Sequence, residues 1–151
     1  MRSTAPTRNT ISRVSGGASE AGCGSWPPLR VDAMSQDPVA LLKRYHAAMN
    51  ALRLDEVETM FAADAEYHSP SVGALIGRDA ILAAMRRYFA EYPDQVAVDE
   101  RLEQLGPDNV RSTWNLRATA KSTGEPYVRR GIEIVRFTSQ GLIRRIEVTD
   151  T

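Results

Sequence analysis

The sequence has almost no cysteine, no excess charge and no long hydrophobic run. Cys23 is the only cysteine, which excludes a disulfide within the chain and a cysteine-based metal site. Nineteen Lys and Arg balance nineteen Asp and Glu without forming a basic block, so the charge pattern argues against a nucleic-acid partner. No window approaches the ~18 apolar residues of a membrane span. We therefore expect a cytoplasmic protein that has neither a membrane nor a nucleic acid as its partner.

Histidine is also scarce. The two histidines, His46 and His68, together with scattered acidic residues do not make a convincing set of metal ligands, so no metal site is expected. His46 follows Tyr45 in a helical pattern, and we interpret it as a residue on the flank of that helix.

Two parts of the chain differ in composition. Residues 1–33 carry four Arg against one Glu and one Asp, with many Ser, Thr, Gly and Pro, and they show neither a helical nor a strand period. We interpret them as a disordered N-terminal tail, or as residues upstream of a true start at Met34; a transit peptide and a regulatory arm are the alternatives. Residues 34–151 show periodic apolar positions and are long enough for one domain with a sizeable core.

Three amphipathic helices are expected in the first half of this domain. Asp37 and Pro38 form a good helix start, because Asp caps the first N–H groups and proline costs nothing at the first helical position. A second helix begins at Asp55, where an acidic residue three positions later resembles a capping box. A short strand over 66–69 follows, and the third helix covers 78–92.

Four strands are expected in the second half, because the apolar period changes from the helical spacing to alternation. They cover about 96–102, 110–121, 127–138 and 142–150, with turn residues between them. Three helices followed by successive antiparallel strands indicate an α+β fold. If the sheet is strongly curved around its helices, it leaves a conical cavity.

This order of elements resembles the nuclear transport factor 2-like superfamily. The resemblance covers residues 37–150 and is closest to SnoaL-like and ketosteroid-isomerase-like small proteins. It is carried by the segments RYHAAMNALRLDEVETMFAADAEYHSP, IGRDAILAAMRRYF and GIEIVRFTSQGLIRRIEV. The resemblance implies three N-terminal helices packed in a strongly curved antiparallel sheet around a conical cavity. It also implies a homodimer formed through the exposed sheet face, and no cofactor.

Three residues are candidates for catalysis. Ketosteroid isomerases bind the oxyanion of their intermediate with a tyrosine in an Arg-Tyr motif of the first helix and with a protonated acid on the long strand. Tyr45 and Glu133 match these two positions. The base of ketosteroid isomerases is an aspartate directly before a strand-ending proline. Ser69 occupies this position here, and a hydroxyl with no adjacent base cannot accept the proton of a substrate carbon. The base would therefore have to be His68 or Glu133 itself. Val148 occupies the place of the acid that epoxide hydrolases and SnoaL-type cyclases carry on the last strand.

The pocket implied by the resemblance has an apolar wall and a polar mouth. Tyr67 and Ser69 share one face of the short strand, while alternation places His68 on the other. The wall residues are expected on the inner face of the sheet: Trp114, Leu116, Val135, Ile146 and Val148. These residues could equally form an ordinary core, and Glu133 could pair with an arginine of a neighbouring strand.

The implied function is the binding of a small apolar, oxygenated ligand. If the protein is an enzyme, the implied class is a cofactor-free isomerase or lyase that stabilises an enolate-like charge. The alternative is a non-catalytic dimerisation or assembly domain whose cavity is filled by its own side chains. A role as a transport adaptor has only the analogy of the fold behind it.

Overall fold

The computed structural model describes residues 37–151. The predicted tail of residues 1–33, with Cys23, and the candidate start at Met34 lie outside the described residues. Within the described range the elements follow one another as α3 (Pro38–Asn50), α4 (Leu54–Met60), β1 (Phe61–Ser69), β2 (Gly73–Ile76), α5 (Arg78–Glu91), β3 (Val96–Gly106), β4 (Asn109–Thr119), β5 (Pro126–Phe137) and β6 (Ile143–Asp150).

These strands form one sheet in the order β2-β1-β6-β5-β4-β3. The neighbours β1 and β6 run parallel, and every other neighbouring pair is antiparallel. The sheet is therefore mixed, which corrects the fully antiparallel sheet that the sequence predicts. The difference arises because the early strand β1 lies beside the last strand, β6, at the centre of the sheet.

The strand β1 is longer than the sequence predicts. It begins at Phe61, whereas the sequence predicts a strand only over 66–69. Phe61 and Ala62 are both buried, and the register with β6 shifts between Phe61 and Glu66. This irregularity breaks the alternation by which a strand is identified. The short strand β2, which the sequence does not predict, pairs with the end of β1.

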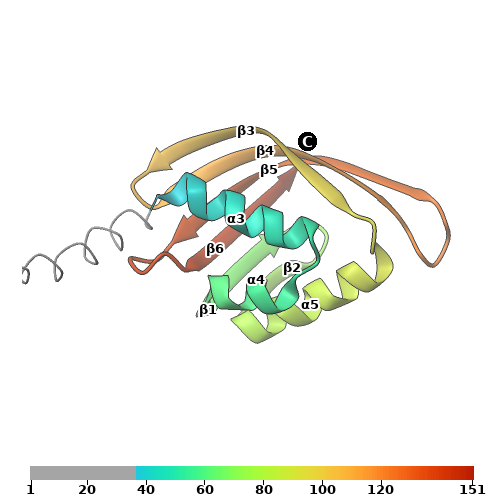
Figure 1. Ribbon diagram of the computed structural model, residues 1–151, viewed down its shortest axis with the longest axis horizontal. Helices are drawn as coiled ribbons and strands as arrows, with labels where there is room; N and C mark the ends of the chain where they lie inside the picture. Colours follow the sequence, from blue (N-terminus) through green and yellow to red (C-terminus); the bar gives the residue numbers. More distant parts are fainter. Residues whose placement is uncertain (1–36) are drawn as a thin grey trace, which may run out of the picture. The chain divides into compact units, whose positions relative to one another are not determined.

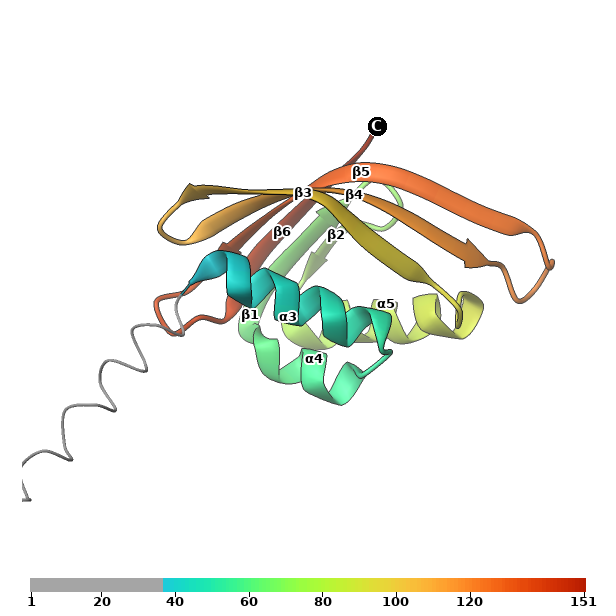
Figure 2. The same cartoon turned by 45° about the horizontal axis from the view of Figure 1, so that its top comes forward.

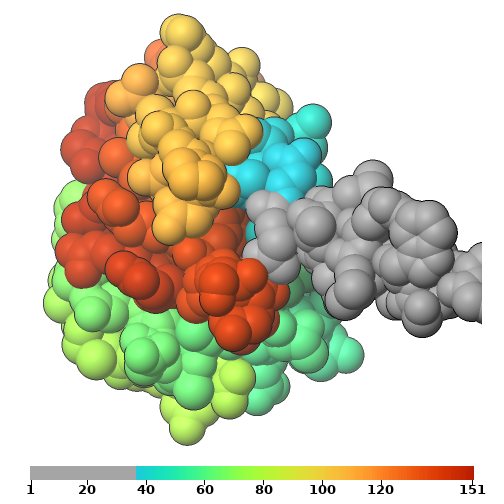
Figure 3. Space-filling view, turned by 90° about the vertical axis from the view of Figure 1, so that its left-hand side faces the viewer, coloured from blue at the N-terminus to red at the C-terminus, as the bar shows by residue number. Residues whose placement is uncertain are grey.

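The three helices cover one face of the curved sheet (Figure 1 and Figure 2). The helix α3 begins as predicted, because the Asp37 side chain accepts a hydrogen bond from the Val39 N–H at 3.1 Å. The helix α3 packs against β3 and β4, while α5 packs against β1 and β2. In the space-filling view of Figure 3, gold atoms gather at one end of this face, green atoms at the other and orange-red atoms of the C-terminal part between them.

Gly131 makes room for the largest side chain of the inner sheet face. Gly131 on β5 is the register partner of Trp114 on β4. A Cβ atom at position 131 would lie 2.7 Å from the indole of Trp114 and 2.6 Å from the carbonyl oxygen of Thr149. The absence of a side chain at this point therefore lets the indole lie close to the backbone of β5.

We expect Gly131→Ala to lower the free energy of unfolding by about 1–3 kcal/mol, because the added methyl group overpacks the indole. Denaturant unfolding measures this loss. In a Trp114→Phe background, which lacks the outer ring that the methyl group would meet, the same substitution should cost at least about 1 kcal/mol less. Equal losses in the two backgrounds would contradict this packing role of Gly131.

Candidate functional site

A cavity of about 140 Å³ lies between the helices and the sheet. Apolar side chains of α5 and of the sheet form much of its wall: Ile81, Met85, Trp114, Leu116 and Val148. Polar side chains also reach it: Tyr45, His46, Tyr67, Tyr88, Arg129 and Glu133. An apolar wall with a few polar groups is the usual form of a small-molecule site.

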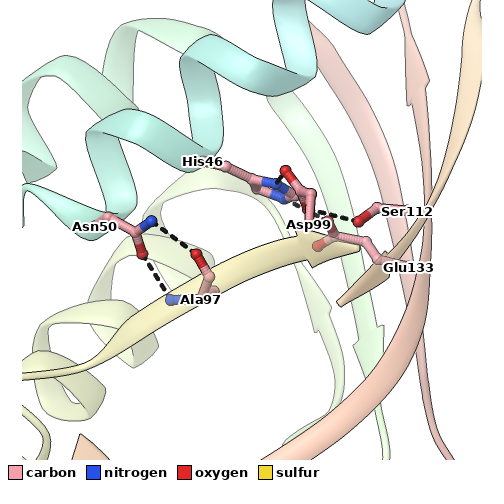
Figure 4. A network of polar contacts seen from close by, with 6 residues as sticks. All are labelled: His46, Asn50, Ala97, Asp99, Ser112 and Glu133. Atoms are coloured by element: carbon pink, nitrogen blue, oxygen red, sulfur yellow. Dashed lines mark hydrogen bonds and ion pairs between the residues drawn. The ribbon is translucent and has the colours of Figure 1, made fainter. Parts of the chain in front are cut away.

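The polar end of the cavity is built around His46, which lies between two carboxylates (Figure 4). Its Nδ1 lies 2.8 Å from an oxygen of Asp99, and its Nε2 lies 2.7 Å from Oε1 of Glu133. The Ser112 hydroxyl donates to the other oxygen of Asp99 at 2.7 Å. These four side chains come from α3, β3, β4 and β5, and we call them the His46 network.

The two carboxylates hold the imidazole in its charged form. Burial opposes the positive charge, but the charge of Glu133 and the hydrogen bonds to Asp99 and Glu133 raise the pKa of His46 to about 10. At neutral pH both ring nitrogens therefore carry protons and both donate. Burial also opposes the charge of Asp99, but hydrogen bonds from His46 and Ser112 outweigh this effect and lower its pKa.

A side-chain clamp holds His46 opposite these acids. One helical turn after His46, the Asn50 amide donates to the carbonyl oxygen of Ala97 and accepts from its N–H, each at 2.9 Å (Figure 4). Ala97 and Asp99 lie on one face of β3, because alternate residues of a strand share a face. Asn50 therefore fixes the position of α3 along β3 and brings the imidazole to Asp99.

Two tyrosines lie in the cavity wall near the network. The rings of Tyr45 and His46 are 5.4 Å apart, and the Tyr45 ring meets that of Phe61 edge-on at 5.6 Å. Burial and the charge of Glu133 raise the pKa of both Tyr45 and Tyr67. Both phenols therefore keep their protons at neutral pH and can donate a hydrogen bond to a ligand.

Arg129 and Tyr88 supply polar groups elsewhere in the wall. Arg129 precedes Glu133 by four residues on the same face of β5, so their Cα atoms lie about 13 Å apart along the strand. Its guanidinium lies 5.6 Å from the ring centroid of Trp114 and donates a hydrogen bond to Asp150. The Tyr88 hydroxyl is buried and has no hydrogen-bond partner within residues 37–151.

The sequence model of the SnoaL-like domain matches residues 42–146, which is more than half of the chain. The chain belongs to the SnoaL-like domain family. This assignment agrees with the resemblance found in the sequence, which is thereby confirmed. No match to this SnoaL-like protein was found among curated proteins.

Solved structures share the fold of this SnoaL-like domain at low sequence identity. An NTF2-like protein of unknown function from Exiguobacterium sp. 255-15 has a TM-score of 0.66 and 18% identity, over 74% of this chain and 98% of that chain. The epoxide hydrolase/cyclase-like enzyme SalBIII, described in pyran ring formation in the polyether salinomycin, has a TM-score of 0.69 and 14% identity, over 80% and 93%. A Mycobacterium tuberculosis protein in complex with estradiol-17β-hemisuccinate has a TM-score of 0.66 and 16% identity, over 74% and 92%. The predicted α+β architecture is confirmed.

Two properties of residues 37–151 bear on other kinds of site. None of their helices combines the length and the apolar character that a membrane crossing needs. Among the same residues, no group of three or more His, Cys, Asp or Glu side chains is arranged to hold a metal ion. In the His46 network the carboxylates contact the imidazole itself and do not converge on a common point.

The structure places most of the predicted site residues of the SnoaL-like domain around the cavity. Tyr45 and Glu133 lie at its polar end. The predicted binding residues found in its wall are Tyr67, Trp114, Leu116 and Val148. Val135 and Ile146 are fully buried in the hydrophobic core and lie outside this wall.

His68 and Ser69 also lie outside the cavity wall. His68 is partly exposed, and its Nε2 lies 2.9 Å from an oxygen of Glu66. The Ser69 hydroxyl bonds with the hydroxyl of Ser71 at 2.8 Å, and Ser71 is the residue that reaches the cavity. The position of His68 therefore gives no support to the predicted role as a base.

His46 and Asp99 are the site residues that the sequence does not reveal. The partners of His46 lie 53 and 87 residues away, so no local pattern marks them. The predicted strand over 96–102 rests on the alternation of Val96, Val98 and Leu102 with polar residues, yet Val96 and Val98 are about half exposed and Asp99 faces α3. The register between β3 and β4 shifts after Asp99, so the side chains beyond this point alternate in the opposite sense. Leu102 therefore does not share a face with Val96 and Val98. Asp99 directly follows Val98 in the predicted strand, and this acidic residue in an apolar pattern is the one sign of the site on β3 that the sequence offers.

The raised pKa of His46 predicts a loss of stability as the pH rises. Folded His46 keeps its proton up to about pH 10, whereas the unfolded chain releases it near 6.5. Between these values the folded state binds more protons, so the stabilisation is complete below the lower value and is lost as the pH rises through the upper one. Between pH 7 and pH 9 we expect the free energy of unfolding to fall by about 2 kcal/mol.

Urea unfolding across this pH range measures the effect. The His46→Gln variant should lack the slope, whereas His68→Gln should keep it. The range ends near pH 9 because the buried tyrosines, whose pKa values are raised, add a slope of the same sign at higher pH. A wild-type slope in His46→Gln would contradict the assignment.

Proposed function

We propose that this SnoaL-like domain binds a small, largely apolar, oxygen-bearing molecule in the cavity, with Glu133 as its polar anchor and proton-transfer group. The observation that carries the proposal is the His46 network at the polar end of an apolar cavity. Buried charges are costly and cluster at functional sites, where their chemistry offsets the loss of stability.

The carboxylate of Glu133 suits general-base chemistry. Its Oε1 accepts from His46, and its second oxygen points away from the imidazole (Figure 4). The hydroxyls of Tyr45 and Tyr67 can stabilise negative charge that develops on a ligand oxygen when a proton leaves. This arrangement supports enolate-type isomerisation or dehydration by side chains alone.

Two structural neighbours support a role in small-molecule chemistry. One binds estradiol-17β-hemisuccinate, and the other, SalBIII, is described in pyran ring formation. Because a fold at such low identity hosts many functions, the inference for this chain depends on its own cavity and on the His46 network.

The alternative function is a non-catalytic assembly domain with a filled interior. The open volume beside Tyr45 and Glu133 favours a ligand site over that alternative.

The homodimer implied by the family resemblance stays a prediction, and sedimentation velocity tests it directly: a single monomeric species would contradict it.

Trp114 provides a fluorescence signal for ligand binding, because it lies in the cavity wall. A Trp26→Phe background removes the other tryptophan of the sequence. Titration with steroids, aromatic ketones and aromatic alcohols should give a saturable change for at least one compound. Glu133→Gln should weaken that binding about tenfold through loss of a charged hydrogen-bond partner. Glu147→Gln, on the exposed side of β6, should leave it unchanged.

For a ketone that binds, proton NMR can follow deuterium uptake from solvent at the carbon beside the carbonyl group. Glu133→Gln should abolish this uptake, because an amide cannot accept the proton. A flat fluorescence response with no thermal shift across the whole panel would contradict ligand binding. Equal deuterium uptake in the two proteins would contradict the role of Glu133 only.

A further inference from the structure

We infer that the ligand of this cavity presents a hydroxyl group to Glu133, so that one ligand oxygen donates to the carboxylate and accepts from a tyrosine. This ligand class rests on the proposed binding function of the cavity, and it narrows the oxygen-bearing ligands to those that carry a hydroxyl group, whether or not they also carry a carbonyl group.

The geometry of the His46 network makes Glu133 a hydrogen-bond acceptor. Each ring nitrogen of His46 has a carboxylate oxygen within 2.8 Å, and a charged imidazole satisfies both with its two N–H groups. The raised pKa of His46 favours this charged form. Glu133 therefore accepts from His46 at Oε1 and retains its second oxygen as an acceptor.

That second oxygen requires a donor from the ligand. Glu133 lines the cavity and is only 6% exposed, so a ligand that fills the cavity takes the place of the water that could reach this oxygen. A carboxylate oxygen that loses its hydrogen-bonded water without gaining another donor makes the free energy of ligand binding less favourable. A carbonyl or ether oxygen of the ligand carries lone pairs but no proton, so it would repel the carboxylate oxygen of Glu133 at this point. The group that meets Glu133 must therefore carry a proton.

The two tyrosines distinguish a hydroxyl from an ammonium group. Tyr45 and Tyr67 line the same cavity, and the charge of Glu133 contributes to the raised pKa of both. A hydroxyl has one proton for the carboxylate and lone pairs for the phenols, whereas an ammonium group has no lone pair to offer.

The apolar part of the wall suits a small ring system. A cavity of about 140 Å³ with an indole and several aliphatic side chains matches one or two fused rings in size. Matched probes are therefore 2-naphthol, its methyl ether and naphthalene. The ether is larger than the alcohol and the hydrocarbon is smaller, so a preference for the alcohol cannot arise from size.

Isothermal titration calorimetry of the full chain with these three probes tests the inference. The wild type should bind 2-naphthol at least about tenfold more tightly than either of the other probes, because a hydrogen bond to a charged group is at stake. In Glu133→Gln the preference should fall below about threefold. In the Glu147→Gln control the full preference should remain.

Three results would overturn the hydroxyl assignment. Equal affinity for all three probes in the wild type overturns it while leaving ligand binding supported. A tenfold preference that persists in Glu133→Gln overturns it, because the hydroxyl then meets another residue. Failure of all three probes to bind overturns it as well, and the wider fluorescence panel then decides separately whether the cavity binds any ligand.

Discussion

The structure of this domain depends on one imidazole held between two carboxylates. His46 links α3 to Asp99 on β3 and to Glu133 on β5 at 2.8 Å and 2.7 Å. Neither acid could face the helices at low cost without this cation between them. A contact that joins the helix to the sheet is therefore also the contact that aims Glu133 at the cavity.

The same network has a cost that points to function. It places two carboxylates and one imidazolium beside an apolar wall, which leaves an excess of negative charge. Stability alone would favour apolar side chains of similar volume at such a site. Sites that retain costly buried charge are commonly those where a ligand or a reaction uses it. A hydroxyl donor from a ligand would compensate the free oxygen of Glu133, and the Trp114–Gly131 contact shapes the apolar wall beside it.

The sequence predicts the helices and the last four strands well because each of them carries its own local signal, such as the helix start at Asp37, whereas β2 and the first part of β1 carry none. The parallel contact of β1 with β6 lacks such a signal, because it joins segments from opposite ends of the domain. In the site, Tyr45 and Glu133 are found by their resemblance to family motifs. His46 and its contact with Asp99 are not, because a hydrogen bond across 53 residues leaves no periodic trace and the register shift in β3 inverts the expected face.

The protonation state of His46 tests this view of the site most directly. The His68→Gln variant retains a single histidine, so its imidazole nitrogen signals can be assigned in an NMR spectrum without ambiguity. We expect both ring nitrogens to stay protonated from neutral pH to about pH 9, because Asp99 and Glu133 both accept from them. An imidazole that loses its proton near pH 6.5, as an isolated histidine does, would contradict the charged network.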